Sequence, residues 1–222
     1  MMENISYWIF KQMLKTYCIP FMRSARISGV LDLPTGPKIF APNHPNITDG
    51  FILPMIIPEK LNFMIMDKAF RYPFVGNVLK LARQIPVNFR DGAKAFQAAK
   101  SRLLNGENVV IFPEGILNPE NKPIPIKTGA ARLSLETGAP IIPVGFYVAP
   151  KDTITLNPKN TRPGPALRCQ VKGNCFVHFG APLITPSSLD TNSLRTEIKN
   201  LTASLTKRIR KLSKQAEKES LK

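Results

Sequence analysis

Cysteine, histidine and acidic residues are all scarce in this 222-residue chain. Its three cysteines, Cys18, Cys169 and Cys175, form no C-x-x-C pair and cannot build a disulfide framework, which favours a reducing, cytoplasmic setting. We expect all three to be small buried apolar residues. A structural zinc site needs four ligands, and the cysteines have too few ligand-type neighbours, so no metal is expected. Of the two histidines, His178 lies at a predicted strand end and is expected to be structural.

Long apolar runs are absent as well. No segment reaches the ~18 to 20 continuous apolar residues that a membrane-spanning helix requires. The N-terminus lacks a cationic region, an apolar core and a small-residue cleavage site in that order, so a signal peptide is not expected. Neither G-x-G-x-x-G nor G-x-x-x-x-G-K-[ST] occurs, and the sequence therefore predicts no dinucleotide or P-loop nucleotide site.

The shortage of acidic residues gives the chain its charge: 31 Lys and Arg face 15 Asp and Glu, for a formal net charge of +16. A chain this basic is attracted to polyanions, which include nucleic acid, an anionic membrane leaflet, phosphate ligands and acidic proteins. RNA recognition would need exposed aromatic side chains on a sheet face, and no such motif is present. Nucleic acid is therefore not an expected partner.

The stretch Asn4–Met22 predicts an amphipathic helix. Lys11 and Lys15 lie opposite a broad apolar face, whose members are Ile5, Ile9, Phe10, Met13, Leu14 and Tyr17. Tyr7 and Trp8 are amphipathic side chains suited to a lipid headgroup boundary. Periodicity alone fits two alternatives equally, a helix at a membrane interface and a helix docked on the protein core.

The remainder alternates short β-rich runs with helical patterns, as is typical of an α/β domain. Strands are expected at Lys38–Ala41, Leu61–Met66, Ile85–Phe89, Val109–Phe112 and Ile141–Val148. Helices are expected at Ala93–Leu104, before Gly106, and at Thr128–Glu136, before Gly138. Leu167–Val171 and Cys175–Phe179 flank Lys172-Gly173-Asn174, which suggests a hairpin. The Pro-rich stretch Asn157–Pro165 is expected to be a loop.

The tail from Ser188 predicts one long helix. Its apolar positions recur at steps of three and four: Leu194, Ile198, Leu201, Leu205, Ile209 and Leu212. The outer face is basic and is either simply solvated or in contact with anionic lipid. We divide the chain into a helical N-terminal segment, 1–30, and one domain, 31–222, that includes this helix.

One histidine, His44, lies in the polar loop Pro42-Asn43-His44-Pro45-Asn46-Ile47-Thr48-Asp49-Gly50. A neutral imidazole is well suited near pH 7 to take a proton from a hydroxyl, provided an acceptor holds its other ring nitrogen. If the turn folds back and a helix begins near Thr48, Asp49 reaches the ring. An isolated H-x-x-x-x-D match fits a merely capped loop histidine equally well.

Three further blocks follow His44 in order. Arg83–Arg90 contains Ile85-Pro86-Val87, Phe112-Pro113-Glu114-Gly115 places a carboxylate at a strand end, and Pro140–Val144 supplies an apolar strand. The order N-H-x-x-x-x-D, I-P-V-x-x-R, F-P-E-G, P-I-I-P-V resembles the glycerolipid acyltransferase superfamily. The resemblance runs from about Lys38 to Phe146 and implies a mixed, mostly parallel β-sheet flanked by helices.

The resemblance also implies roles for individual residues. His44 would deprotonate the acceptor hydroxyl and Asp49 would orient His44, while Glu114 would bind the polar head of the acceptor. Arg90 would grip an acidic group, since a guanidinium can hold phosphate through two hydrogen bonds. The remaining expected substrate-binding residues are Asn43, Lys68, Phe112, Pro113, Gly115 and Lys127. No cofactor is implied beyond the thioester co-substrate, acyl-CoA or acyl carrier protein.

Two departures from the family pattern concern the acceptor. The family often has F-P-E-G-T-R or F-P-E-G-T-x-S, whereas Ile116 and Leu117 follow Gly115 here. Asn88-Phe89 precedes Arg90 where one residue is usual. A lipid acceptor without phosphate therefore stands beside 1-acylglycerol-3-phosphate, the lysolipid that the family best supports.

The expected setting is the inner face of a membrane, where a peripheral cytoplasmic enzyme meets anionic lipid and a lysolipid acceptor. Two alternatives belong to other classes. A non-catalytic basic module that binds anionic lipid explains the charge but leaves the ordered blocks unexplained. A thioester hydrolase would release acyl groups without any lipid acceptor.

Overall fold

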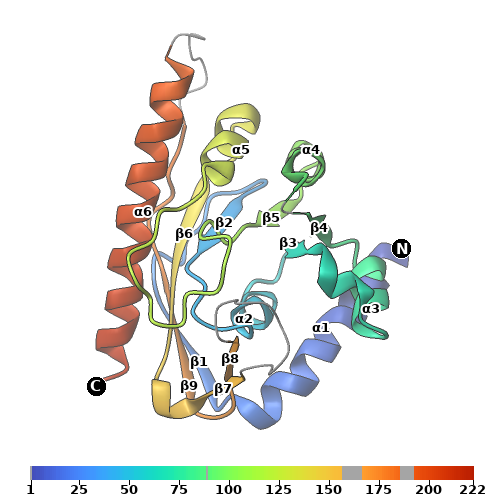
Figure 1. The fold of residues 1–222 in the computed structure, drawn as a ribbon, viewed down its shortest axis with the longest axis vertical. Helices are drawn as coiled ribbons and strands as arrows, with labels where there is room; N and C mark the ends of the chain where they lie inside the picture. Colours follow the sequence, from blue (N-terminus) through green and yellow to red (C-terminus); the bar gives the residue numbers. More distant parts are fainter. Residues whose placement is uncertain (1, 89, 157–166, 186–192) are drawn as a thin grey trace.

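The computed structural model describes residues 2–88, 90–156, 167–185 and 193–222. Its main sheet has seven strands in the order β1-β9-β6-β2-β5-β3-β4 (Figure 1). These strands are β1 Ser24–Gly29, β2 Ile39–Pro42, β3 Leu61–Met66, β4 Ile85–Val87, β5 Asn108–Val110, β6 Ile141–Val148 and β9 Asn174–Phe179. Only β6 and β9 pair antiparallel. The predicted α/β fold with a mixed, mostly parallel sheet is therefore confirmed.

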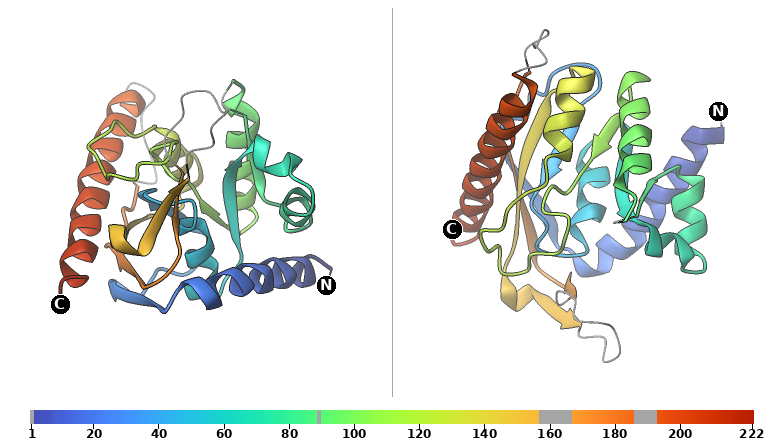
Figure 2. Two further views of the ribbon diagram at one scale, coloured as in Figure 1. Left: turned by 60° about the horizontal axis from the view of Figure 1, so that its bottom comes forward. Right: turned by 45° about the horizontal axis from the view of Figure 1, so that its top comes forward.

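Helices cover both faces of this sheet (Figure 2). They are α1 Met2–Phe21, α2 Asp49–Ile56, α3 Val75–Leu81, α4 Gly92–Leu104, α5 Gly129–Thr137 and α6 Leu194–Glu219, with short 3-10 turns η1 Asp67–Arg71 and η2 Pro150–Asp152. Along β2, Ile39 packs toward α4, α5 and α6, whereas Phe40 packs toward α2. The alternation follows from the two-residue period of a strand and makes the centre of the sheet buried on both faces.

The N-terminal helix α1 has one docked face and one exposed apolar face. Tyr7, Phe10, Leu14 and Cys18 are buried, and the first three pack with α3. Exposed large apolar side chains include Ile5, Trp8 and Ile9. Docking is therefore part of the explanation for the apolar pattern, although it leaves a second apolar surface uncovered. The side chain of Tyr17, expected on the apolar face, lies outside the described part.

Two sequence predictions are wrong. Ser24–Gly29, assigned to the helical segment 1–30, forms β1 and pairs with β9 across 150 residues of sequence. The expected hairpin does not form, because β8, Leu167–Gln170, pairs with β7, Thr153–Leu156, in a separate two-stranded sheet. Long-range pairing of β9 with β1 and β6 overrides the local turn signal. Residues 157–165, expected to be a loop, lie outside the described residues.

The C-terminal helix α6 packs along β6 and β9 as its periodicity predicts. Leu201, Leu205, Ile209 and Leu212 are buried on its inner face. Gly145 of β6 permits this packing, since a Cβ there would overlap the backbone of Leu212 and Ser213. The described helix begins at Leu194, and residues 188–192 lie outside the described part.

Candidate active site

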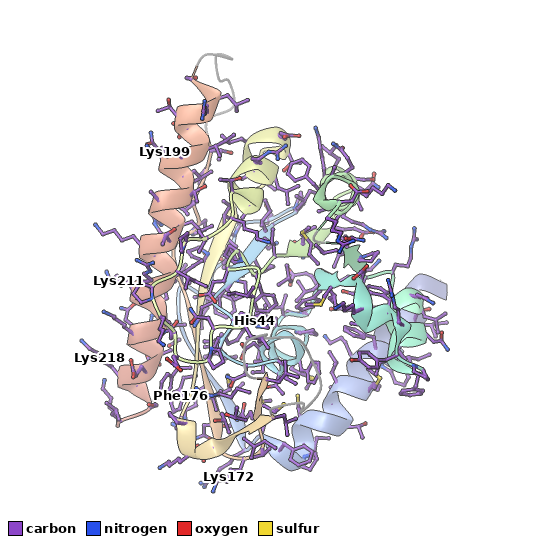
Figure 3. All side chains as sticks on the ribbon, viewed as in Figure 1. His44, Lys172, Phe176, Lys199, Lys211 and Lys218 are labelled. Atoms are coloured by element: carbon purple, nitrogen blue, oxygen red, sulfur yellow. The ribbon has the colours of Figure 1, made fainter. Side chains whose placement is uncertain are left out.

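The candidate site is at the carboxyl ends of β2 and β5, two adjacent parallel strands at the centre of the sheet. His44 follows β2 directly, and its label lies near the middle of the molecule, beside α2 (Figure 3). The buried run of β2 fixes the start of the loop, and α2 begins at Asp49. Ligand sites of parallel α/β sheets form at this edge.

His44 and Asp49 meet as the loop folds back. His44 Nδ1 lies 3.3 Å from Asp49 Oδ2. The Asp49 side chain is 0% exposed, whereas that of His44 is 21% exposed. The same carboxylate accepts hydrogen bonds from the backbone N–H of Asn46 at 2.7 Å and from its side-chain amide at 3.3 Å. Asp49 is thus a fixed acceptor for Nδ1, and Nε2 is the ring nitrogen left for substrate.

Glu114 joins the loop after β5 to the loop after β2. Its Oε2 accepts the backbone N–H of His44 at 3.3 Å, and its Oε1 accepts the side-chain amide of Asn118 at 3.4 Å. The backbone N–H of Asn118 donates in turn to the carbonyl of His44 at 2.8 Å. The ring of Phe112 stacks on the imidazole from the same side of the sheet. The F-P-E-G segment therefore holds His44 through both its backbone and its ring.

Burial raises the pKa of both carboxyl groups at the site. Desolvation raises the pKa of Asp49, and hydrogen bonds from His44 and Asn46 oppose the shift. Desolvation also raises the pKa of Glu114, against hydrogen bonds from Asn118 and from the His44 backbone. Water is thus partly excluded from the site, which strengthens the electrostatic interactions within it.

Gly115 and Lys127 are in close contact beside Glu114. Gly115 has φ of 68°, a left-handed conformation that favours glycine. A Cβ at this position would lie 2.7 Å from Lys127 Cε and 2.8 Å from Lys127 Nζ. The backbone N–H of Lys127 donates to the carbonyl of Pro113 at 2.7 Å. The glycine therefore makes room for the Lys127 side chain next to the chain segment that carries the half-buried Glu114.

Asn43 supports the loop from behind. Its side-chain oxygen accepts the backbone N–H of Phe146 at 2.6 Å, and its amide donates to the Phe146 carbonyl at 3.1 Å. The amide also reaches Asn121 at 3.3 Å, and Asn121 donates to Ser213 of α6 at 2.9 Å. Asn43 is 1% exposed, so a direct contact with substrate has no support in this structure.

Lys68 and Arg90 lie at the same edge of the sheet but outside this cluster. Lys68 is exposed on η1, after β3, and Arg90 is exposed just beyond the edge strand β4. In the part of the chain that the structure describes, no hydrogen bond or ion pair joins either cation to His44 or Glu114. Binding of an acceptor by these two residues stays a prediction.

The sequence did not single out Asn118, which bonds both His44 and Glu114. Asn46 and Asn121 have comparable supporting positions. Asn118, followed by proline, signalled only a turn, because its bond to the His44 carbonyl joins two loops that are far apart in the sequence; the bonds from Asn46 to Asp49 are local. Within the described ranges, no group of three or more His, Cys, Asp or Glu could hold a metal ion.

The arrangement suits proton abstraction from a hydroxyl. A partly exposed imidazole is held at Nδ1 by a buried carboxylate, and a second carboxylate accepts the backbone N–H of the same histidine. Fold and site together define an α/β protein with an H-x-x-x-x-D pair facing an F-P-E-G loop at the sheet edge.

Comparison with known proteins gives this class its name. Residues 24–147, more than half of the chain, match the model of the family described as Acyltransferase. The chain belongs to this family, which confirms the resemblance to the glycerolipid acyltransferase superfamily.

Its curated relatives are named for one activity. A 1-acyl-sn-glycerol-3-phosphate acyltransferase from Limnanthes alba is 27% identical over 110 residues, covering 48% of this chain and 39% of that protein. The enzyme of the same name from Borreliella burgdorferi is 36% identical over 90 residues, covering 38% and 36%. The chloroplastic enzyme BAT2 from Brassica napus is 24% identical over 147 residues, covering 64% and 42%. The chain thus matches less than half the length of these relatives.

A solved structure confirms the fold. The 1-acyl-sn-glycerophosphate (LPA) acyltransferase PlsC from Thermotoga maritima superposes with a TM-score of 0.67 at 17% identity, covering 99% of this chain and 83% of that one. The shared architecture extends over the N-terminal helix and α6 as well as the family segment.

Proposed function

We propose that this protein transfers a fatty acyl group from a thioester donor to the hydroxyl of a lysolipid, with 1-acylglycerol-3-phosphate as the preferred acceptor. The observation that carries the proposal is the His44–Asp49 pair, held against Glu114 inside the segment that matches the Acyltransferase family. The identity of the acceptor is taken from the relatives, which are 1-acyl-sn-glycerol-3-phosphate acyltransferases.

The chemistry follows from the geometry. His44 Nε2 takes the proton of the acceptor hydroxyl while Nδ1 donates to Asp49, which stabilises the imidazolium without being protonated. The acceptor oxygen attacks the thioester carbonyl, the C–S bond breaks and an ester forms. The imidazolium returns its proton to the departing thiolate. The acceptor hydroxyl and the donor thioester are bound together next to Nε2, so the acyl group is transferred directly and no acyl-enzyme is required.

We assign Lys127, beside Gly115, and the exposed Lys68 and Arg90 to the acidic head of the acceptor. Glu114 orients the head through its polar groups. An acceptor without phosphate is the second candidate, favoured by Ile116 and Leu117 at positions where the family often has Thr and Arg.

A thiol-release assay with acyl-CoA or acyl carrier protein and a set of lysolipids tests the proposal. Release should depend on the acceptor, and 1-acylglycerol-3-phosphate should exceed monoacylglycerol. His44→Ala should lower kcat about 10²- to 10⁴-fold, the usual contribution of positioned proton transfer. His178→Ala is the matched control, since the polar contacts of this second histidine are with Ser28 and Glu219, which are not residues of the candidate site. Acceptor-independent release, or full activity in His44→Ala, would contradict the proposal.

We also propose that the protein works as a peripheral enzyme on the inner face of a membrane. No helix in the described ranges is both long enough and apolar enough to span a bilayer. Ile5, Trp8 and Ile9 on α1 and Tyr72 and Phe74 before the adjoining α3 are exposed large apolar side chains, of the kind that a lipid headgroup region would cover.

A further inference from the structure

A groove of about 480 Å³ opens between α6 and the chain segment that leads into α5. Pro125 and Ile126 form one wall, and Ile198 and Ala203 of α6 form the other. Arg195 and Lys199 lie at its rim, and both are exposed. Ile126 and Ile198 also pack against the core, so the floor of the groove is continuous with it, and the groove is an open apolar surface with cations on one side.

The groove lies next to the candidate site along the chain. Ile126 and Thr128 line it, while the intervening Lys127 turns to Gly115 and bonds Pro113 through its backbone. A molecule seated in the groove would thus rest against the back of the segment that supports Glu114.

The outer face of α6 extends the positive charge of the rim down the molecule. Between Leu194 and Lys214 this helix has a single acidic residue, Glu197, and seven cations: Arg195, Lys199, Lys207, Arg208, Arg210, Lys211 and Lys214. Arg208 and Arg210 donate to backbone carbonyls, and in the described part of the chain no carboxylate forms an ion pair with any of the seven. The charge of this face is consequently available to an external partner.

Two observations favour a soluble partner over a membrane. Helix α6 lies on the side of the molecule opposite α3 and the N-terminal half of α1 (Figures 1 and 2), and Lys199, Lys211 and Lys218 lie along its outer edge (Figure 3). Between Lys199 and Lys218, α6 exposes no large apolar side chain that could insert into lipid. A protein that meets lipid through α1 and α3 presents α6 to the solvent.

We propose that the groove and the basic face of α6 dock a small acidic protein, whose acidic helix meets the cations while an apolar side chain enters the groove. This inference rests on the proposed acyl transfer, in which the partner is the protein that carries the acyl thioester, an acyl carrier protein. Charge complementarity of this kind raises the association rate and selects the partner, and the apolar slot fixes its register.

The test compares two charge-reversed proteins with equal net charge. Arg195→Glu/Lys199→Glu reverses the rim, and Lys94→Glu/Lys151→Glu reverses exposed cations on α4 and η2 as the matched control. With palmitoyl-acyl carrier protein, the rim variant should show a KM at least about tenfold higher at similar kcat, because like charges now face each other. With palmitoyl-CoA both variants should match the wild type.

A second variant leaves charge unchanged. Ala203→Trp fills the groove and should raise the KM for palmitoyl-acyl carrier protein, while the KM for palmitoyl-CoA should stay unchanged. Direct binding is measured by fluorescence anisotropy of labelled holo acyl carrier protein in the His44→Ala background, so docking is scored even without turnover. We expect binding to be lost only in the rim and groove variants. Added salt should weaken the binding of the wild-type protein, because it screens the charges of both partners.

Three outcomes would overturn the docking proposal. Equal KM increases for both donors would place the shared phosphopantetheine arm, and not the protein, in the groove. Reduced binding to anionic vesicles with unchanged carrier-protein binding would make α6 a lipid surface. Unchanged binding in every variant would leave the groove without this partner. Absence of transfer from either donor alongside intact docking would contradict only the proposed function.

Discussion

The imidazole of His44 lies against the ring of Phe112, with ring centroids 3.9 Å apart and planes inclined by 26°. The two rings come from loops after different strands, β2 and β5, so their contact fixes the position of one loop against the other. Together with the Asp49 contact at Nδ1, it leaves the imidazole little freedom to rotate.

Replacing Phe112 by Leu should therefore affect rate more than binding. The aliphatic side chain no longer presents a flat surface to the imidazole, and a small misplacement of a catalytic group can cost about 10²-fold. We expect kcat to fall about 10- to 100-fold with a modest change in KM. Phe96→Leu, at a buried ring on α4, is the control for loss of aromatic volume. Equal losses of activity in the two variants would show that the stacking has no special role.

The sequence predicted the central part of the fold because that part is encoded locally. β3 and β6 have the predicted bounds, since each is a short apolar run that is paired with a strand on both sides. The predicted strands before His44 and Glu114, which are β2 and β5, place both residues at one edge, because the carboxyl ends of parallel strands meet there. The position of β1 could not be predicted, because Ser24–Gly29 is largely exposed and lacks a strong apolar pattern.

The supporting polar network was equally hidden from the sequence. Asn43, Asn118 and Asn121 bond across the β2 loop, the β5 loop and α6. Isolated asparagines follow no helix or strand period from which such contacts could be predicted, and their local pattern indicates only turns. Asn43 was consequently expected at the substrate, whereas its amide is used inside the protein.

Glu114 should contribute a measurable pH dependence to stability. Its folded-state pKa is raised above the usual value of about 4.5 by desolvation, so the folded state binds the proton more tightly than the unfolded state. This contribution is fully present below that value and is lost as pH rises through the folded pKa. Glu114→Gln removes the titration, so its free energy of unfolding, relative to wild type, should increase from pH 4.5 upward. Urea unfolding across this range measures the difference, and a flat difference would refute the assignment.

Gly145 should be essential to the packing of α6. A methyl group at this position overlaps the backbone of Leu212 and Ser213, and neither can move without lifting the helix from β6. Gly145→Ala is expected to lower the free energy of unfolding by about 1–3 kcal/mol, the usual cost of overpacking. It should also lower activity, since Ser213 supports Asn121 and, through it, Asn43.

Gly92→Ala provides the comparison for Gly145→Ala. Gly92 begins α4, and a Cβ there meets nothing within 4 Å. Chemical denaturation should show stability unchanged or increased by up to about 1 kcal/mol, because alanine reduces the entropy of the unfolded chain. Similar destabilisation of both variants would mean that the close approach at Gly145 is not the cause.

The adjacent residues Tyr7 and Trp8 should separate the two roles of α1. The Tyr7 hydroxyl accepts the backbone N–H of Leu61 at 3.1 Å, and burial raises the pKa of Tyr7 to about 12. Tyr7→Phe leaves this N–H without its partner in a buried position and should lower the free energy of unfolding by about 1–3 kcal/mol. Urea denaturation measures the loss, and vesicle binding of the folded variant should be unchanged.

Trp8 points the other way, with 60% of its surface exposed. Trp8→Ser should keep stability within about 0.5 kcal/mol of wild type, because an exposed side chain makes few contacts that folding requires. It should nevertheless weaken flotation with anionic liposomes, since an interfacial indole contributes both apolar area and a polar N–H. A large loss of stability in Trp8→Ser, or unchanged flotation, would show that the exposed face of α1 does not meet lipid. In that case α1 would serve only to dock on the protein core, and the polyanion that the basic charge attracts would not be a lipid surface at this helix.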